Sequence, residues 1–133
     1  MRTWALVLVF VWLIGGDGFA ADWDGQLFRD ESTLEFMTVS PDGEEYWSTV
    51  WLVVIDGDVY INLGKRAAER LRANTRAPFV SVRVAGSEFG GIRADPAQER
   101  QKDVAAAIAA KYWTGLLVPY AAPSLVMRLR PGT

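Results

Sequence analysis

The chain has 133 residues, half of them hydrophobic, a size and composition typical of one globular domain with a packed core. Its formal net charge of −2 argues against a general nucleic-acid-binding protein, which needs a basic surface. The sequence contains neither cysteine nor histidine, which excludes disulfides, thiol nucleophiles, Cys/His zinc sites and Ser-His-Asp triads. Any chemistry must therefore come from carboxylates, hydroxyls, lysine, arginine, tyrosine or a bound cofactor.

The first twenty residues have the pattern of a secretory signal peptide. Arg2 gives a short positive start, residues 4–14 are an uninterrupted apolar run, and small residues up to Ala20 suit cleavage after that position. The run is short for a bilayer span, and a retained membrane anchor is the alternative. We therefore expect residues 1–20 to be removed and the mature protein to be secreted or periplasmic, without membrane contact after cleavage.

Three strands are predicted in the first half of the mature chain. Residues 21–32 are acidic without a clear period, so only one helical turn is expected there. Residues 33–40 alternate between apolar and polar positions and end at a Pro41-Asp42-Gly43 turn. Residues 45–55 are apolar on both faces, which predicts a central strand covered on both sides. Asp56-Gly57 is a hairpin turn sequence that leads into the third strand, residues 59–63.

Two helices and three strands are predicted in the second half of the chain. Residues 65–73 have one apolar stripe and predict a short helix, which is followed by strands at 79–84 and 87–93. A longer helix is expected to begin at Asp95-Pro96, with Asp95 as N-cap and Gln98 completing a capping box. Its core-facing stripe is Val104, Ile108 and Tyr112, and Gly115 is expected to end it. Residues 125–130 alternate again and form the last strand.

This order of elements predicts the fold class. Successive hairpins without regular strand–helix alternation indicate a mainly antiparallel α+β domain. Six short strands with one short and one longer helix fit a small barrel, which leaves few open strand edges. We therefore expect a single barrel domain over residues 33–131.

Several short motifs follow one another between residues 48 and 84. They are Thr49-Val50-Trp51, the hairpin Asp56-Gly57-Asp58-Val59-Tyr60, Lys65 at a helix start, Leu71-Arg72-Ala73-Asn74, and the alternating Val80, Val82 and Val84. Together they resemble the core of the flavin-binding split-barrel superfamily, the pyridoxamine 5′-phosphate oxidase-like proteins, although Val50 stands where those proteins have proline. Residues 91–131 are similar to an uncharacterised branch grouped with the deazaflavin-dependent nitroreductases.

The resemblance implies a six-stranded split barrel that forms a homodimer and binds FMN or a deazaflavin in grooves at the dimer interface. The flavin itself would carry out electron or hydride transfer, so the absence of histidine and cysteine does not prevent an oxidoreductase activity. Carried onto this chain, the cofactor-binding candidates along the ring are Ser48, Thr49, Val50 and Trp51. Those near the phosphate are Asn62, Leu63, Gly64, Lys65 and Arg66.

The residues themselves also suit an anion at the start of the short helix. Free N–H groups and the helix dipole favour negative charge there, Lys65 adds a point charge and Arg66 can add a bidentate contact. Solvated surface charge is the alternative for this pair, and Trp51 is more readily explained as a core residue of a β-strand. No catalytic residue and no metal ligand is identified.

Two other functions stay open at this stage. Flavins are made in the cytoplasm, so an exported chain has to acquire its cofactor after crossing the membrane. A split barrel that binds a planar ligand such as haem or flavin without turnover is therefore one alternative. A purely structural exported dimer is the other.

Overall fold

A computed structural model describes residues 22–112 and 125–132 of the chain. The predicted signal peptide, residues 1–20, and the predicted helix end at Gly115 lie outside these residues. The elements in chain order are η2 (Gly25–Phe28), β1 (Thr33–Val39), β2 (Glu45–Ile55), β3 (Asp58–Leu63), α2 (Lys65–Arg72), β4 (Phe79–Val84), β5 (Ser87–Pro96), η3 (Gln98–Arg100), α3 (Gln101–Lys111) and β6 (Leu125–Pro131). Among the described residues, no helix is long and apolar enough to cross a membrane.

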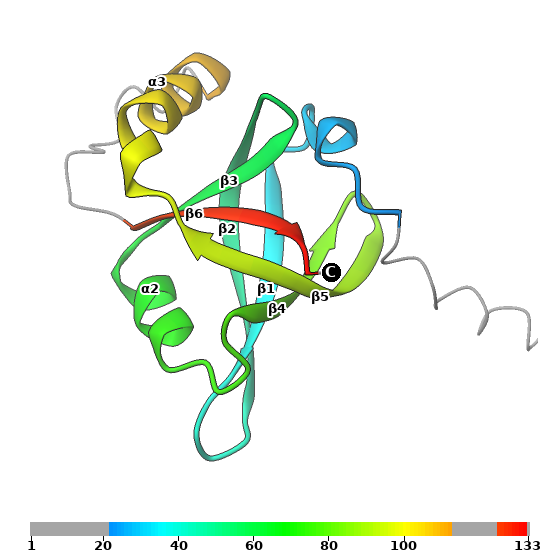
Figure 1. Ribbon diagram of the computed structural model, residues 1–133, viewed down its shortest axis with the longest axis vertical. Coiled ribbons are helices and arrows are strands. Elements are labelled where there is room, and N and C mark those ends of the chain that lie inside the picture. Colours follow the sequence, from blue (N-terminus) through cyan, green and yellow to red (C-terminus); the bar gives the residue numbers. More distant parts are fainter. Residues whose placement is uncertain (1–21, 113–124, 133) are drawn as a thin grey trace, which may run out of the picture.

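The six strands close into one antiparallel barrel with the order β1-β2-β3-β6-β5-β4 (Figure 1). Helix α2 lies at one end of the barrel, beside the β1–β2 hairpin, and α3 lies near the opposite end. The predicted fold class, an α+β six-stranded antiparallel barrel with a short and a longer helix, is confirmed. Closure gives each strand a neighbour on both sides, but β2 pairs with β3 only over residues 52–55. Residues 45–51 of β2 therefore pair with β1 alone among the described strands.

The period-two pattern of the strands decides which side chains fill the barrel. On β1, Leu34, Phe36 and Thr38 point inward and are each 1% exposed. Their neighbours in the interior come from all six strands and include Leu52, Ile61, Val82, Ile92 and Leu129. Alternation on these short strands is therefore enough to specify the main core.

Strand β2 is not covered along the whole of its outer face, contrary to the prediction. Val53 is buried beneath α3, but Thr49 on the same face is exposed and Trp47 is only partly buried. Helix α3 contacts β2 and buries Val53, but it leaves Thr49 exposed. A strand with apolar residues on both faces thus has one face in the barrel core and part of the other open.

The tight turn at Asp56-Gly57 is confirmed. Both residues have positive φ angles, 53° and 83°, and Ile55 pairs directly with Asp58 across the turn. Two consecutive residues with positive φ define the type I′ geometry that matches the twist of a β-hairpin, and Asp-Gly adopts it readily.

The start of the longer helix differs from the prediction. Asp95 and Pro96 are the last residues of β5 and pair with Arg128 and Met127 of β6. The carboxylate of Asp95 accepts two 3.0 Å bonds from Nε of Arg93 and does not cap a helix. The helical turn begins at Gln98 instead, whose Oε1 accepts a 2.6 Å bond from the backbone N–H of Val126. Hydrogen-bonded pairing with β6 extends β5 three residues beyond the predicted end at residue 93. This pairing thus overrides the local signal for a helix N-cap.

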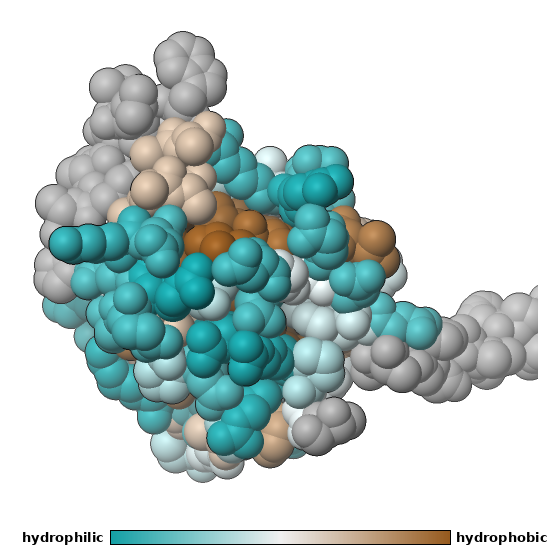
Figure 2. Space-filling view, turned by 45° about the horizontal axis from the view of Figure 1, so that its top comes forward, coloured by the Kyte–Doolittle hydropathy of each residue, from teal (hydrophilic) through white to brown (hydrophobic). Residues whose placement is uncertain are grey.

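Helix α3 packs on the outside of the barrel through a second, smaller core. Val104 and Ile108 are buried against Val53, Tyr60 and Val126. On the face shown in Figure 2, a hydrophobic band lies in the middle of a mainly hydrophilic surface. Helix α3 therefore forms an additional outer layer on one side of the barrel. It lies next to the exposed part of β2.

The η2 turn covers part of the barrel's interior next to the β2–β3 hairpin. The rings of Trp23, Phe28 and Phe89 meet edge to face with centroid separations of 4.9, 5.2 and 5.7 Å. The segment before β1, for which the sequence predicted a single helical turn, is thus an integral part of the hydrophobic core.

Candidate functional site

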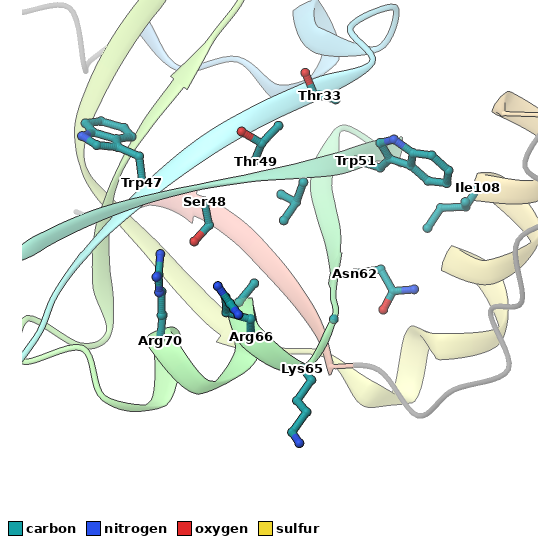
Figure 3. Close-up of a pocket in the computed structure, with 13 residues that line it drawn as sticks. Thr33, Trp47, Ser48, Thr49, Trp51, Asn62, Lys65, Arg66, Arg70 and Ile108 are labelled. Atoms are coloured by element: carbon teal, nitrogen blue, oxygen red, sulfur yellow. The ribbon is translucent and has the colours of Figure 1, made fainter.

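A groove of about 570 Å³ runs beside the uncovered part of β2 and is lined by side chains from both faces of this strand (Figure 3). It is bounded by the end of β3, the start of α2 and Ile108 of α3, and we call it the β2 groove. Its lining residues are Thr33, Trp47, Ser48, Thr49, Val50, Trp51, Asn62, Gly64, Lys65, Arg66, Ala67, Arg70 and Ile108.

The structure brings the predicted site residues together. The four on β2 and four of the five between β3 and α2 all line the β2 groove. The exception is Leu63, which is 1% exposed and belongs to the barrel core. Side chains alternate along β3, so Asn62 faces the groove and Leu63 must face inward. Whether the eight residues bind a cofactor stays a prediction.

Five lining residues were not predicted, namely Thr33, Trp47, Ala67, Arg70 and Ile108. Arg70 follows Arg66 by four residues, so helix periodicity alone places the two on one face of α2. Trp47 shares the outer face of β2 with Thr49 by strand alternation. To predict Thr33 as a groove residue, one needs the register of β1 against β2, and to predict Ile108, one needs the position of α3. A single sequence provides neither.

One end of the groove carries positive charge without compensating carboxylates. Arg66 and Arg70 extend from α2 toward β2, whereas the side chain of Lys65 points away from β2 (Figure 3). Within the part of the chain that the structure describes, none of the three forms an ion pair. The guanidinium of Arg70 instead lies 4.1 Å above the ring of Tyr46. Two guanidinium groups and the start of α2 therefore converge on a place suited to an anion.

The other end of the groove is an aromatic wall. The ring of Trp51 stacks on Tyr112 with centroids 4.5 Å apart and an interplanar angle of 7°. The hydroxyl of Tyr112 donates to the carbonyls of Ser32, at 2.5 Å, and Leu52, at 2.8 Å. These bonds fix the position of the tyrosine ring, so Trp51 has a rigid support on one side.

Lys111 reinforces the same attachment of α3 to the barrel. Its ammonium group donates to the carbonyls of Glu31, at 2.5 Å, and Leu52, at 3.1 Å. Partial burial lowers the pKa of Lys111, while the negative charges of Asp30 and Glu31 oppose this shift. The last turn of α3 is thus tied to β2 and to the segment before β1 by four hydrogen bonds from two residues.

Between the two ends lies an amide that lacks a partner. The Oδ1 atom of Asn62 is buried and accepts no hydrogen bond within the described part of the chain. An unpaired buried carbonyl is costly, and a ligand with an N–H or O–H group would remove that cost. Along its length, the groove therefore offers first an anion site, then a hydrogen-bond acceptor and finally an aromatic surface.

A second cavity of about 770 Å³ adjoins the groove and shares Thr33 and Thr49 with it. Its charged residues are Glu31, Glu35, Glu88 and Arg83, and Arg83 bridges Glu35 at 3.7 Å and Glu88 at 3.3 Å. The outer face of the barrel therefore has a basic half and a half with an acidic excess. No cluster of three metal-ligating side chains occurs among the residues that the structure describes.

Sequence comparisons leave the family unassigned, since neither a protein-family model nor a curated protein matches the chain. Solved structures do match the fold. A domain-swapped dimer superposes with a TM-score of 0.59 at 14% identity, covering 74% of this chain and 80% of that one. An F420-H2-dependent reductase gives a TM-score of 0.57 at 14% identity, and the match covers 74% of this chain and 94% of the reductase chain.

An FAD-binding protein from Mesorhizobium loti gives a TM-score of 0.51 at 16% identity, covering 79% of this chain and 85% of that one. At these identities the comparisons show the fold alone. They agree with the closed antiparallel barrel of six strands described above. The chain therefore shares with these solved structures the fold of a closed six-stranded antiparallel barrel.

Proposed function

We propose that the chain binds FMN or a deazaflavin in the β2 groove and acts as an oxidoreductase. The observation that carries the proposal is the β2 groove itself, in which unpaired arginines, an unpaired buried amide oxygen and a supported indole ring follow one another. Structural neighbours that are an F420-H2-dependent reductase and an FAD-binding protein support this class of ligand.

The residues present fit such a cofactor. Arg66 and Arg70 would hold a phosphate at the start of α2, because guanidinium groups make bidentate charge-assisted bonds to phosphate oxygens. The Oδ1 atom of Asn62 would accept a hydrogen bond from the cofactor, and Trp51 would form an apolar wall along its ring system. When bound, the cofactor supplies the hydride or electron transfer.

The protein's own contribution would be to position the cofactor and exclude water. The outer face of β2 is open around Thr49 in a single chain, so a groove of this shape gives one side of the ligand no protection. A second copy that packs against this face would close it, and the domain-swapped dimer among the structural neighbours supports a homodimer. The ligand would then lie at the interface between the two copies.

Export is part of the proposal. The apolar run at residues 4–14 motivates a secreted or periplasmic protein, which would have to take up its cofactor after the signal peptide is removed. N-terminal sequencing of the protein recovered from its native host tests this step. We expect a mature start at Ala21, and a chain that still begins at Met1 would contradict it.

The anion end of the groove gives the most specific test. We expect Arg66→Gln to weaken FMN binding about tenfold or more, since a charge-assisted hydrogen bond contributes about 1.5–3 kcal/mol. Lys65→Gln should weaken it less, because that side chain points away from β2. Fluorescence titration with FMN measures both, and Lys102→Gln, an exposed residue of α3 outside the groove, is the matched control. Equal affinity of the Arg66 variant and the control would contradict this placement of the phosphate.

A binding module without turnover is the second candidate function, and the predicted export favours it because flavins are made in the cytoplasm. Reduction of the bound cofactor by an electron donor distinguishes the two. An oxidoreductase bleaches the flavin absorbance and passes the electrons to an added acceptor. A binding module holds the flavin, or a different planar ligand such as haem, and transfers nothing.

A further inference from the structure

A further cavity, smaller than the two described above, lies between α2 and the β1–β2 hairpin. It has a volume of about 230 Å³ and is lined by Thr38, Ser40, Tyr46, Glu69, Arg70 and Ala73. The cavity shares Arg70 with the β2 groove and none of the groove's other lining residues. We call it the α2 pocket.

Thr38 gives the α2 pocket a hydrogen-bonding group that has no partner. The residue is 1% exposed, and its Oγ1 atom is buried without a hydrogen bond in the described part of the chain. A buried hydroxyl is normally paired, because burial removes its bonds to water. Thr38 lies on the inner face of β1, where its neighbours Leu34 and Phe36 are apolar, so packing alone does not call for a hydroxyl at this position.

The other hydroxyls of the pocket already have partners. The Tyr46 hydroxyl donates to Oε1 of Glu44 at 3.0 Å. The Ser40 hydroxyl donates to Asp42 and accepts a 3.2 Å bond from the backbone N–H of Glu44. Tyr46 is paired with Thr38 across the two strands, so its bond to Glu44 keeps the wall of the pocket in place. The groups left for a ligand are therefore Thr38 and the two charged residues of α2.

These two residues have opposite charge and follow one another in α2. Arg70 stacks on the Tyr46 ring at 4.1 Å, and neither Arg70 nor Glu69 forms an ion pair with any described residue. A pocket with one unpaired cation, one unpaired anion and one unpaired hydroxyl has no net charge but is strongly polar. A ligand with both a carboxylate and an ammonium group matches it best, because each of its charged ends then finds an opposite charge.

We propose that the α2 pocket binds a small zwitterion, of which a free α-amino acid is the simplest kind. Arg70 binds the carboxylate and Glu69 binds the ammonium group of the ligand. The ligand also supplies the hydrogen-bond partner that the hydroxyl of Thr38 lacks. The volume of about 230 Å³ admits an amino acid with a small side chain. The site shares Arg70 with the proposed flavin phosphate site, so the two ligands would compete for this side chain, and the test is made without flavin.

Two-dimensional NMR of the ¹⁵N-labelled chain, titrated with L-alanine in the absence of flavin, tests the proposal. We expect saturable shifts of the backbone amides of Thr38, Tyr46 and Arg70. Acetate and methylammonium, each with only one of the two charges, should bind at least tenfold more weakly. Failure of L-alanine to saturate the shifts, or acetate binding as tightly as L-alanine, would overturn the assignment.

Matched variants separate a binding role from a structural one. Thr38→Val keeps the shape of the side chain and should weaken L-alanine binding at least tenfold, whereas Lys102→Gln, an exposed residue of α3 that lines neither cavity, should leave it unchanged. Glu69→Gln, an exposed residue at the rim of the pocket, gives a second test if the Thr38 variant does not fold. Unchanged L-alanine affinity in Thr38→Val and Glu69→Gln would show that L-alanine binds elsewhere and would overturn the assignment.

Discussion

Asp58 and Arg130 join the first residue of β3 to the end of β6 on the outer surface of the barrel. Nε of Arg130 donates to Oδ1 of Asp58 at 3.2 Å and an Nη donates to Oδ2 at 2.8 Å. The hydrogen bonds from Arg130 hold the pKa of Asp58 below its ordinary value of 3.8, and the charges of Arg128 and Arg100 act in the same direction. Burial of the carboxylate opposes the shift only in part.

This ion pair makes stability depend on pH in a defined direction. Because the folded-state pKa of Asp58 is lowered, its contribution is present above pH 3.8 and is lost as the pH falls through the folded-state value. We expect Asp58→Asn to lower the free energy of unfolding by about 0.5–1 kcal/mol at neutral pH, since the pair is partly exposed. Urea unfolding at neutral pH and in acid, below the folded-state pKa of Asp58, measures this, because a carboxylate that is protonated in both states contributes nothing.

Glu45→Gln is the control, since Glu45 is exposed and has no ion pair among the described residues. Its stability should follow that of the wild type at both pH values. A deficit of the Asp58 variant that persists unchanged in acid would show that the substitution acts through packing or hydrogen bonding and not through the charge.

Much of the β2 groove follows from residue periodicities that the sequence displays. Strand alternation places Thr49 and Trp51 on one face of β2, and helix periodicity places Arg66 and Arg70 on one face of α2. The same alternation would have removed Leu63 from the candidates, because Asn62 beside it faces outward. The direction of the Lys65 side chain, away from β2, could not be predicted, since it depends on the orientation of the whole helix against the barrel.

At the scale of elements, the η2 turn and the β2–β3 hairpin are packed backbone against backbone. Gly25 is buried, and a Cβ atom placed on it would lie 2.3 Å from the carbonyl oxygen of Gly57 and 3.2 Å from Val59. Gly57 is itself fixed by the positive φ of the type I′ turn, so neither side can move without breaking the hairpin geometry. Gly25 is therefore required for close approach of the two segments.

We expect Gly25→Ala to lower the free energy of unfolding by about 1–3 kcal/mol, the usual range for forcing an extra carbon into a packed region. Gly90→Ala is the matched control, because a Cβ atom there meets nothing within 4 Å. Thermal unfolding of the two variants measures the difference. A Gly25 variant as stable as the Gly90 variant would contradict the close contact between η2 and the hairpin.

The element boundaries show where sequence reasoning succeeds and where it fails. All six strands and both helices were predicted near their observed positions, because alternation, Asp-Gly and the apolar stripes are local signals. The predicted helix start at Asp95-Pro96 was wrong because these residues pair with β6. That strand lies about 30 residues later in the chain, so the local signal gives no indication of it. Partial exposure of the outer face of β2 was missed for the same reason, since only the assembled barrel shows how far α3 extends over that strand.

For the molecule as a whole, we expect a second copy to add at the part of β2 that no other described strand or helix encloses, where Thr49 is exposed. The outer face of β2 combines the basic β2 groove with the neighbouring cavity that carries Glu31, Glu35 and Glu88. Two copies related by a twofold axis can place the basic half of each against the acidic half of the other. This arrangement would cover Thr49 and complete the groove around a bound flavin.

We propose that this barrel holds a flavin-type cofactor in a groove shared by two copies of the chain. Sedimentation of the mature chain with FMN or a deazaflavin, recorded at protein and flavin wavelengths together, tests it most directly. We predict that flavin absorbance co-sediments with a species of twice the chain mass, in equimolar amount with the chain. Protein that sediments free of every cofactor offered, at any oligomeric state, would contradict the claim.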